Sequence, residues 1–412
     1  MQAAPVLKRE VGNWVDGDRF WDRVDEIAQF IEHLDEGAHI LLIAPRRTGK
    51  TSLMREVSRR LDDRYICVHA DLEHCRSATD AIVELSVATR EHRGLWSKVR
   101  DGFGRLLGRA DELKIDEIIL KLRDGVGDAW QQTGDRYFAE LANAEKPVAL
   151  FIDELPILVN RMLREGEAGS GRAAVDVFMS WLRSVAQRHR GKVRLVISGS
   201  IGLGPVLQAA NLSATINHFT PFQLDPWTPA IAEGCLEALA RHYTLILGAG
   251  VTARMVEHLG WCIPHHVQTF FSHVYEDARR RREEVVEVED VDRVYKERML
   301  SSRGHAELSH YEERLRLVLG EDVLPVALDL LTEAAITGRL GAEVANAIIE
   351  DHRPDDSVSA RRVLLRRLLD LLDHDGYLRA VDGGFGFRSK LLRDWWEARF
   401  GFGYVARAGA GS

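Results

Sequence analysis

The chain has 412 residues and a formal net charge of −8, with 45% hydrophobic and 29% charged residues. This composition is typical of a soluble globular protein, and the length suits two to four domains. The acidic excess excludes a strongly basic nucleic-acid coat and leaves room only for a local basic patch. No run of 18 apolar residues is present and the N-terminus lacks the apolar core of a signal peptide, so we expect no membrane span and no secretion.

The cysteines and histidines indicate neither disulfides nor a metal centre. Four cysteines stand far apart, no Cys-x-x-Cys occurs, and the 16 histidines form no ligand cluster. We therefore expect reduced thiols in a cytoplasmic protein. The cysteines are Cys67, Cys75, Cys235 and Cys262.

Hydrophobic patterning predicts alternating helices and strands over the first 225 residues. Apolar groups at helical spacing predict helices at 18–34, 51–61, 79–87 and 173–190. Short apolar runs predict buried strands at 38–44, 65–70, 148–152, 193–198 and within 218–224. Strands that alternate with helices indicate an α/β fold, in which a parallel sheet lies between two layers of helices.

Residues 90–145 interrupt this alternation, and we expect them to form an insertion on the surface of the sheet. Residues 94–108 have an amphipathic helical pattern, and residues 113–125 alternate apolar and charged groups as a half-exposed strand would. An amphipathic helix usually covers a core, and a membrane-surface role is the alternative.

The C-terminal half has a different pattern. Residues 228–300 are helical without a strong strand, and three more helices are predicted at 323–336, 341–350 and 358–373. Two short strands joined at residues 382–384 then form a hairpin, and Ser389 caps a closing helix. Three helices followed by a hairpin is the order of a winged helix.

The segment 44–51, A-P-R-R-T-G-K-T, lies between a buried strand and a helix and fits the phosphate-loop pattern G-x-x-x-x-G-K-[ST] except at its first place. Such a loop surrounds a phosphate with main-chain N–H groups, and the helix dipole adds positive potential. Gly49 lets the backbone approach the phosphate, Lys50 bridges the β- and γ-phosphates, and Thr51 offers a hydroxyl to Mg²⁺. The predicted nucleotide-binding residues of the loop are Ala44, Pro45, Arg46, Arg47, Thr48, Gly49, Lys50, Thr51 and Ser52.

A second acidic motif follows a later strand. Residues 148–152 are all apolar, and Asp153 and Glu154 come directly after them. Because parallel sheets hold ligands at the carboxyl edge of their strands, both carboxylates are expected beside the phosphate loop. Asp153 would then hold Mg²⁺ with Thr51, and Glu154 would orient and deprotonate an attacking water. Ser200, after the next strand, is either a catalytic hydroxyl near that water or γ-phosphate, or part of a small-residue turn.

These motifs resemble the AAA+ and STAND groups of P-loop ATPases, and in particular the prokaryotic ATPases related to the origin-recognition initiators. The resemblance spans about residues 15–400. It is carried by FWDR at 20–23, APRRTGKTSL at 44–53, LFIDELP at 150–156, ISGS at 197–200, GWCIP at 260–264 and FRSKLLRDWW at 387–396.

The resemblance implies a leader (1–35), an ATPase core (36–225), a helical lid (226–302), a winged helix (303–400) and a tail (401–412). It implies that residues 15–23 border the adenine and that Gly260 and Pro264 lie in the lid near the nucleotide. His265 or His266 stands where a γ-phosphate sensor of the lid is expected. Arg188 and Arg190 are candidates, by position, for an arginine that acts on a neighbouring subunit's nucleotide.

The predicted winged helix has basic and acidic groups side by side. Residues 321–400 contain 11 lysines and arginines against 15 acidic residues. Arginines on the third helix and around the hairpin could meet DNA phosphates, or could form an ordinary solvated face. The basic residues are Arg361, Arg362, Arg366, Arg367, Arg379, Arg388 and Lys390.

Three functions are therefore compatible with the sequence. The first is a Mg²⁺-dependent ATP-hydrolysing switch that acts on an unknown protein partner and assembles into oligomers on ATP binding. The second is a DNA-associated ATPase, such as a loader, transposition regulator or defence component, whose winged helix binds duplex DNA. The third is a nucleotide-binding scaffold without turnover.

Overall fold

The computed structural model describes residues 7–12, 14–106, 130–165, 170–301 and 305–407. The chain forms two compact units. Unit 1 comprises Met1–Asp22, Pro45–Gly49 and Asp225–Ser412, and unit 2 comprises Arg23–Ala44 and Lys50–Leu224. Among the described residues, no helix combines the length and apolar character needed to cross a bilayer.

Unit 2 is built on a five-stranded parallel sheet in the order β2-β3-β4-β1-β5. All five strands predicted from the sequence are confirmed. Strands β3 and β4 lie inside the sheet and are buried because both of their faces are covered; β3 is apolar up to Asp153, whereas β4 contains the buried Arg194. The strands are β1 (His39–Ile43), β2 (Ile66–Asp71), β3 (Val148–Asp153), β4 (Val193–Ile197) and β5 (Phe219–Gln223).

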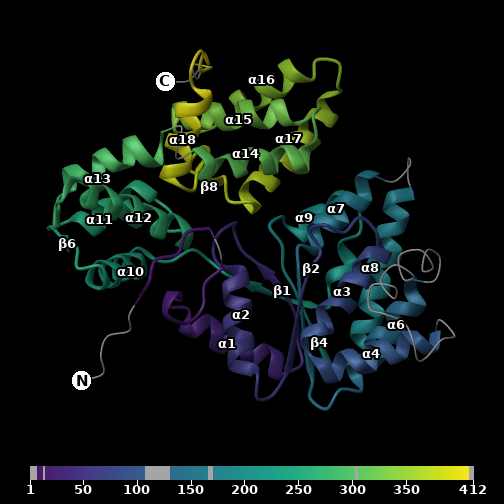
Figure 1. Cartoon of the computed structure of the whole chain (residues 1–412). Helices are drawn as coiled ribbons and strands as arrows, with labels where there is room; N and C mark the ends of the chain where they lie inside the picture. Colours follow the sequence, from purple (N-terminus) through teal and green to yellow (C-terminus); the bar gives the residue numbers. More distant parts are fainter. Residues whose placement is uncertain (1–6, 13, 107–129, 166–169, 302–304, 408–412) are drawn as a thin grey trace. The chain divides into compact units, whose positions relative to one another are not determined.

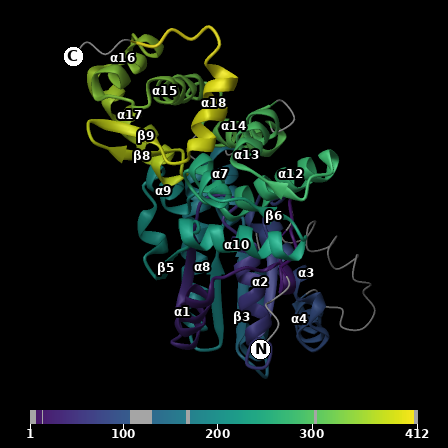
Figure 2. The same ribbon diagram turned by 90° about the vertical axis from the view of Figure 1, so that its left-hand side faces the viewer.

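Helices cover both faces of this sheet. In Figures 1 and 2 the strands run side by side, with α1 and α2 on one face and α3, α4, α6 and α8 on the other. This is the three-layer α/β arrangement predicted above. The helices are α1 (Val24–Asp35), α2 (Lys50–Leu61), α3 (Ala78–Ala88), α4 (Arg93–Leu106), α6 (Trp130–Ala142), α7 (Leu155–Glu165), α8 (Ser170–Arg188) and α9 (Leu203–Ala209).

Helix α6 differs from the expected surface insertion. Its side chains Tyr137, Phe138 and Leu141 are at most 1% exposed, and the helix packs against α3, α4 and α8. This part of segment 90–145 therefore belongs to the core of unit 2. The strand expected at 113–125 lies outside the described residues.

Helix α1 begins six residues later than its apolar pattern predicts. Asp22 and Arg23 have φ values of 61° and 69°, a left-handed conformation that cannot continue a right-handed helix. Val24 consequently lies at the exposed first position, whereas Ile27 and Leu34 are fully buried.

Unit 1 contains the predicted helical region and the C-terminal elements. Two very short parallel strands, β6 (Ile246–Leu247) and β7 (Val285–Val286), join its first helices and were not predicted. The helices of this part are α10 (Pro229–His242), α11 (Val251–Leu259), α12 (Pro264–Arg281) and α13 (Val288–Val294), followed by a π-helical turn, Tyr295–Met299.

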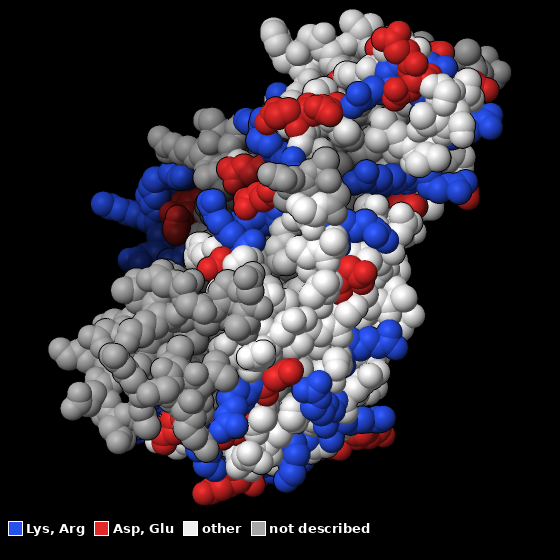
Figure 3. Space-filling model, turned by 90° about the vertical axis from the view of Figure 1, so that its right-hand side faces the viewer, with Lys and Arg blue, Asp and Glu red and all other residues white. Residues whose placement is uncertain are grey.

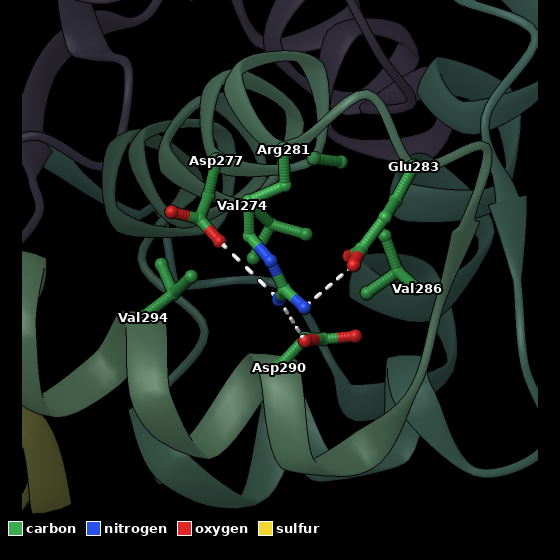
Figure 4. Close-up of a pocket in the computed structure, with 8 residues that line it drawn as sticks. Val274, Asp277, Arg281, Glu283, Val286, Asp290 and Val294 are labelled. Atoms are coloured by element: carbon green, nitrogen blue, oxygen red, sulfur yellow. Dashed lines mark hydrogen bonds and ion pairs between the residues drawn. The ribbon is translucent and has the colours of Figure 1, made fainter.

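A network of ion pairs fixes α12 to α13. Figure 4 shows Arg281 reaching between Asp277, Glu283 and Asp290, with the guanidinium 2.6 Å from Glu283 and 2.5 Å from Asp290. Arg293 bonds the same Asp277 at 2.7 Å. The arginines at the end of α12 therefore form ion pairs, as the neighbouring acidic residues indicate. The carboxylates that line this pocket are already paired with arginines.

After residue 320 the C-terminal elements of unit 1 have the order predicted for a winged helix, whereas the helix before them, α14 (His305–Leu319), was not predicted. Leu340 bridges to Phe385 of the hairpin, and the hairpin is closed at residues 382–383. The apolar groups of these elements share one hydrophobic core with α10–α13. The elements are α14 (His305–Leu319), α15 (Leu324–Thr337), α16 (Ala342–His352), α17 (Val358–His374), β8 (Leu378–Val381), β9 (Gly384–Phe387) and α18 (Lys390–Phe400).

Candidate nucleotide site

The phosphate-loop segment turns sharply between β1 and α2. Arg47 and Gly49 have φ values of 63° and 98°, so the loop passes twice through the left-handed region. Glycine adopts this conformation without strain, which explains its place before Lys50. The hydroxyl of Thr48 donates to the carbonyl of Pro45 at 2.9 Å and closes the turn.

Lys50 and Thr51 begin α2 in unit 2. Lys50 is 8% exposed, and its ammonium group donates to the carbonyl of Ala44 at 3.3 Å. Thr51 Oγ1 donates to Asp153 Oδ2 at 3.0 Å, although the two residues are 102 positions apart in the chain. Parallel pairing within the sheet therefore brings the predicted threonine and aspartate together, while Ser52 lies buried on α2.

Asp153 lies at the carboxyl end of β3 and has further polar neighbours. Ser198 Oγ, at the end of β4, donates to Asp153 Oδ1 at 2.5 Å. Asp71 ends β2 in direct register with Asp153, and burial together with the nearby Asp153 charge raises the pKa of Asp71. Three adjacent strands thus place oxygen groups at one edge of the sheet.

The carboxylate of the next residue, Glu154, is fixed by hydrogen bonds from Ser200. Its backbone has φ 56°, and its carboxylate accepts the Ser200 N–H at 2.8 Å and the Ser200 hydroxyl at 3.0 Å. Burial, followed by the neighbouring Asp153 charge, raises the pKa of Glu154, while the bonds from Ser200 oppose this shift. The predicted Ser200 therefore contacts the glutamate itself.

Within unit 1, Arg47 of the loop is hydrogen-bonded to His265 Nε2. His265 follows Pro264, the first residue of α12. Gly260 packs against the start of α18: a Cβ at this position would lie 2.8 Å from the backbone nitrogen of Lys390. The glycine of the GWCIP segment therefore permits close packing of α11 against α18.

The remaining sequence candidates have contacts of their own. Arg188 pairs with Asp135 at 3.2 Å. Within the segment expected beside adenine, Trp21 donates its indole N–H to the Ile231 carbonyl at 3.3 Å. The arginine candidates and the adenine contact stay predictions.

Sequence reasoning assigned no partner to Ser198. Only the alignment of β3 with β4 shows that Ser198 contacts Asp153.

The donor chemistry at this edge fits Mg²⁺. The ion prefers oxygen ligands and keeps several waters, so a hydroxyl and a carboxylate from the protein suffice. Thr51 and Asp153 provide these two groups at 3.0 Å from each other. No cluster of three or more histidine, cysteine or acidic ligands, as a tightly held metal would require, is found in the described part of the chain.

The structure of the chain is similar to solved structures of known proteins. No family model and no curated protein matches the sequence. The Walker-type ATPase of Pyrococcus abyssi superposes with a TM-score of 0.61 at 16% identity, over 94% of this chain and 99% of that one. The chain has the fold of the AAA+ ATPases related to the origin-recognition initiators.

The Orc2 protein of Aeropyrum pernix, solved in ADPNP–ADP complexes, has the same AAA+ fold. It superposes with a TM-score of 0.52 at 12% identity, over 92% of this chain and 94% of that one. Both likenesses cover nearly the whole chain, so the AAA+ fold includes unit 1 as well as the sheet of unit 2. The division of unit 1 at residue 302 stays a prediction.

Proposed function

We propose that this protein binds ATP with Mg²⁺, hydrolyses it, and acts as a nucleotide-controlled switch on a protein partner. The observation that carries the proposal is the contact of Thr51 with Asp153 at 3.0 Å, beside the half-buried Glu154. A hydroxyl from a phosphate loop, a strand-ending aspartate and an adjacent glutamate are the groups that ATP hydrolysis requires.

Each residue has a distinct task in this proposal. The loop amides and the Lys50 ammonium hold the phosphates, and Thr51 and Asp153 hold Mg²⁺. Mg²⁺, when bound, neutralises charge on the phosphate oxygens. Glu154 orients the attacking water and accepts its proton, and burial raises the pKa of this carboxyl above its usual value. Ser200 fixes the Glu154 carboxylate and is a positioning residue.

Steady-state phosphate release, together with ATP binding by calorimetry, tests the proposal. We expect Glu154→Gln to keep ATP affinity and to lower turnover by about 100-fold or more, since the proton acceptor is lost. Lys50→Ala should lose affinity. Lys146→Ala, at an exposed lysine that only reaches the Asp62 carbonyl, is the matched control and should change neither.

Two results would contradict this function. Equal hydrolysis by wild type and Glu154→Gln would remove the catalytic role and leave a nucleotide-binding scaffold. No heat with ATP and Mg²⁺ would remove nucleotide binding altogether.

A second candidate function rests on α17. Arg362, Arg366 and Arg367 are exposed, and in the described part of the chain none has an ion-pair partner. Other predicted basic groups are already engaged: Arg388 pairs with Asp373 and Lys390 with Asp394, each at 2.6 Å. The free arginines on one helix could bind phosphates of duplex DNA.

The wider surface gives this candidate limited support. Figure 3 shows basic and acidic groups interspersed over one face of the molecule, in keeping with the net charge of −8. A DNA contact would therefore depend on the local arginines of α17.

Fluorescence anisotropy with a random duplex, with and without ATP, separates the two candidates. DNA binding through α17 predicts that Arg362→Glu with Arg366→Glu abolishes binding and that affinity falls steeply with salt. Arg241→Glu with Lys296→Glu changes the same charge at exposed positions elsewhere in unit 1 and serves as the control. Undetectable wild-type binding at low salt would leave the protein-partner switch as the function.

A further inference from the structure

The first residues of α18 are bonded to the end of α11, although 130 positions of the chain separate them. The hydroxyl of Ser389, 1% exposed, donates to the Leu259 carbonyl at 3.0 Å and accepts the Leu392 N–H at 3.2 Å. The last carbonyls of a helix have no partner within the helix, and neither do its first N–H groups. One buried hydroxyl therefore satisfies the ends of both helices, and each end depends on the other.

The same two helix ends approach each other closely at Gly260. This residue has φ 66°, and a Cβ there would lie 2.9 Å from the Cβ of Lys390. Glycine adopts such a backbone and leaves the space free. Any side chain at this position would be strained and would push α11 away from α18.

A second layer of contacts joins the turn after α13 to both helices. The ring of Tyr295, 3% exposed, stacks on that of His258 in α11, with centres 4.0 Å apart. Its hydroxyl donates to Asp394 of α18 at 2.9 Å, and Lys390 pairs with Asp394 at 2.6 Å. His258 is in turn hydrogen-bonded to Asp292 of α13 at 2.6 Å. Side chains of α11, α13, the turn that follows it and α18 therefore interlock.

The other side of α18 packs on the C-terminal elements. In Figures 1 and 2, α18 lies between α13 and α15. Trp395 and Trp396 are fully buried, and the indole N–H of Trp396 donates to Thr332 Oγ1 of α15 at 3.3 Å. Moving α18 away from either neighbour would expose large aromatic surface to water, which is unfavourable.

We propose that α18 locks helices α10–α13 to the C-terminal elements α14–α17, β8 and β9, so that unit 1 responds to a nucleotide as one rigid body. The trigger rests on the proposed ATP binding and reaches unit 1 through α12, because His265 is hydrogen-bonded to Arg47 of the phosphate loop. The rigid body itself rests only on the contacts of α18. It follows that a movement of α12 also moves α17 and its exposed arginines, with no hinge between the predicted lid and the predicted winged helix.

Distance measurements by electron paramagnetic resonance on the full chain test this inference. Spin labels are attached at Arg241→Cys in α10 and Val363→Cys in α17, both exposed positions, and the half-buried Cys67 is replaced by serine. We expect one narrow distribution of distances between the labels. It should shift by less than about 2 Å when ADP or a non-hydrolysable ATP analogue is added with Mg²⁺.

Two variants of the labelled chain test whether α18 is the lock. Gly260→Ala introduces the clash with Lys390, and Ser389→Ala removes the hydroxyl that both helix ends share. We expect each variant to lose the single narrow distribution, so the test survives if one of them does not fold. Gly341→Ala, at a glycine whose Cβ would have open space around it, is the matched control and should keep the narrow distribution.

The outcomes separate this inference from the proposed function. Two populations of distances in the wild type, or a larger shift with nucleotide, would overturn the rigid body. A narrow distribution in both Gly260→Ala and Ser389→Ala would show that α18 is not the lock. Calorimetry of the same labelled chain records nucleotide binding separately. A chain that binds no nucleotide would lose the proposed function and the trigger, whereas a narrow distribution in that chain would still support the lock.

Discussion

Ser200 holds the carboxylate of Glu154 through its main-chain N–H at 2.8 Å and its hydroxyl at 3.0 Å. Glu154 adopts a left-handed backbone, a conformation that is unfavourable for a side chain of this kind. The loop after β4 therefore fixes the orientation of the residue after β3. This relationship gives the proposed base two fixed hydrogen bonds within unit 2 and leads to the first two predictions.

Ser200→Ala should lower kcat and move its pH dependence. The variant keeps the main-chain bond but loses the hydroxyl bond, which opposes the rise in the pKa of Glu154. We expect a fall in kcat of several-fold, roughly 1 kcal/mol, and an acid limb shifted to higher pH. Phosphate release measured across pH checks this, with Ser213→Ala, at an exposed serine, as the control. If the acid limb of the kcat–pH profile is the same in Ser200→Ala as in the wild type, the hydroxyl does not affect the pKa of Glu154.

The wild-type rate should fall on the acid side with a midpoint above 4.5. Burial and the Asp153 charge raise the pKa of Glu154 above the usual 4.5, and the carboxylate accepts a proton only when ionised. Activity is therefore present above the raised pKa and lost as pH falls through it. The measurement is kcat against pH at saturating ATP and Mg²⁺, and a midpoint at or below 4.5 would contradict the role of Glu154.

Asp153→Asn should weaken the binding of Mg²⁺ at the nucleotide site. The change removes the negative charge that faces the Thr51 hydroxyl, and we expect the Mg²⁺ concentration for half-maximal hydrolysis to rise at least about tenfold. Asp176→Asn, on the exposed side of α8, should leave the Mg²⁺ dependence unchanged. Identical Mg²⁺ titrations of wild type and Asp153→Asn would exclude Asp153 from the metal site.

Gly134→Ala should destabilise unit 2 although alanine favours helices. A Cβ at Gly134 would lie 2.3 Å from Trp181, a buried side chain of α8, so the packing of α6 must shift. We expect a loss of about 1–3 kcal/mol in the free energy of unfolding. Gly94→Ala in α4, with open space around it, should instead be neutral or stabilise by up to about 1 kcal/mol. Urea denaturation of both variants measures these free energies of unfolding, and an equally stable Gly134→Ala variant would contradict the prediction.

The sequence alone determined the sheet and named the candidate groups of the site. Residues 148–152 are apolar because β3 is covered on both faces, and this pattern is legible without a structure. The loop ending in Lys50 and Thr51 and the acidic pair at 153–154 are local in sequence, and the rule that parallel strands end at one edge relates them. Their proximity could therefore be predicted from topology, and the contact of Thr51 with Asp153 agrees with it.

Only the tertiary structure decided which hydroxyl serves which carboxylate. Ser198 and Ser200 are two positions apart and look alike in sequence, yet the alignment of β4 with β3 directs Ser198 to Asp153 and Ser200 to Glu154. Local patterning reports which face of a strand or helix is buried, whereas side-chain partners across elements depend on register and packing, which are non-local properties.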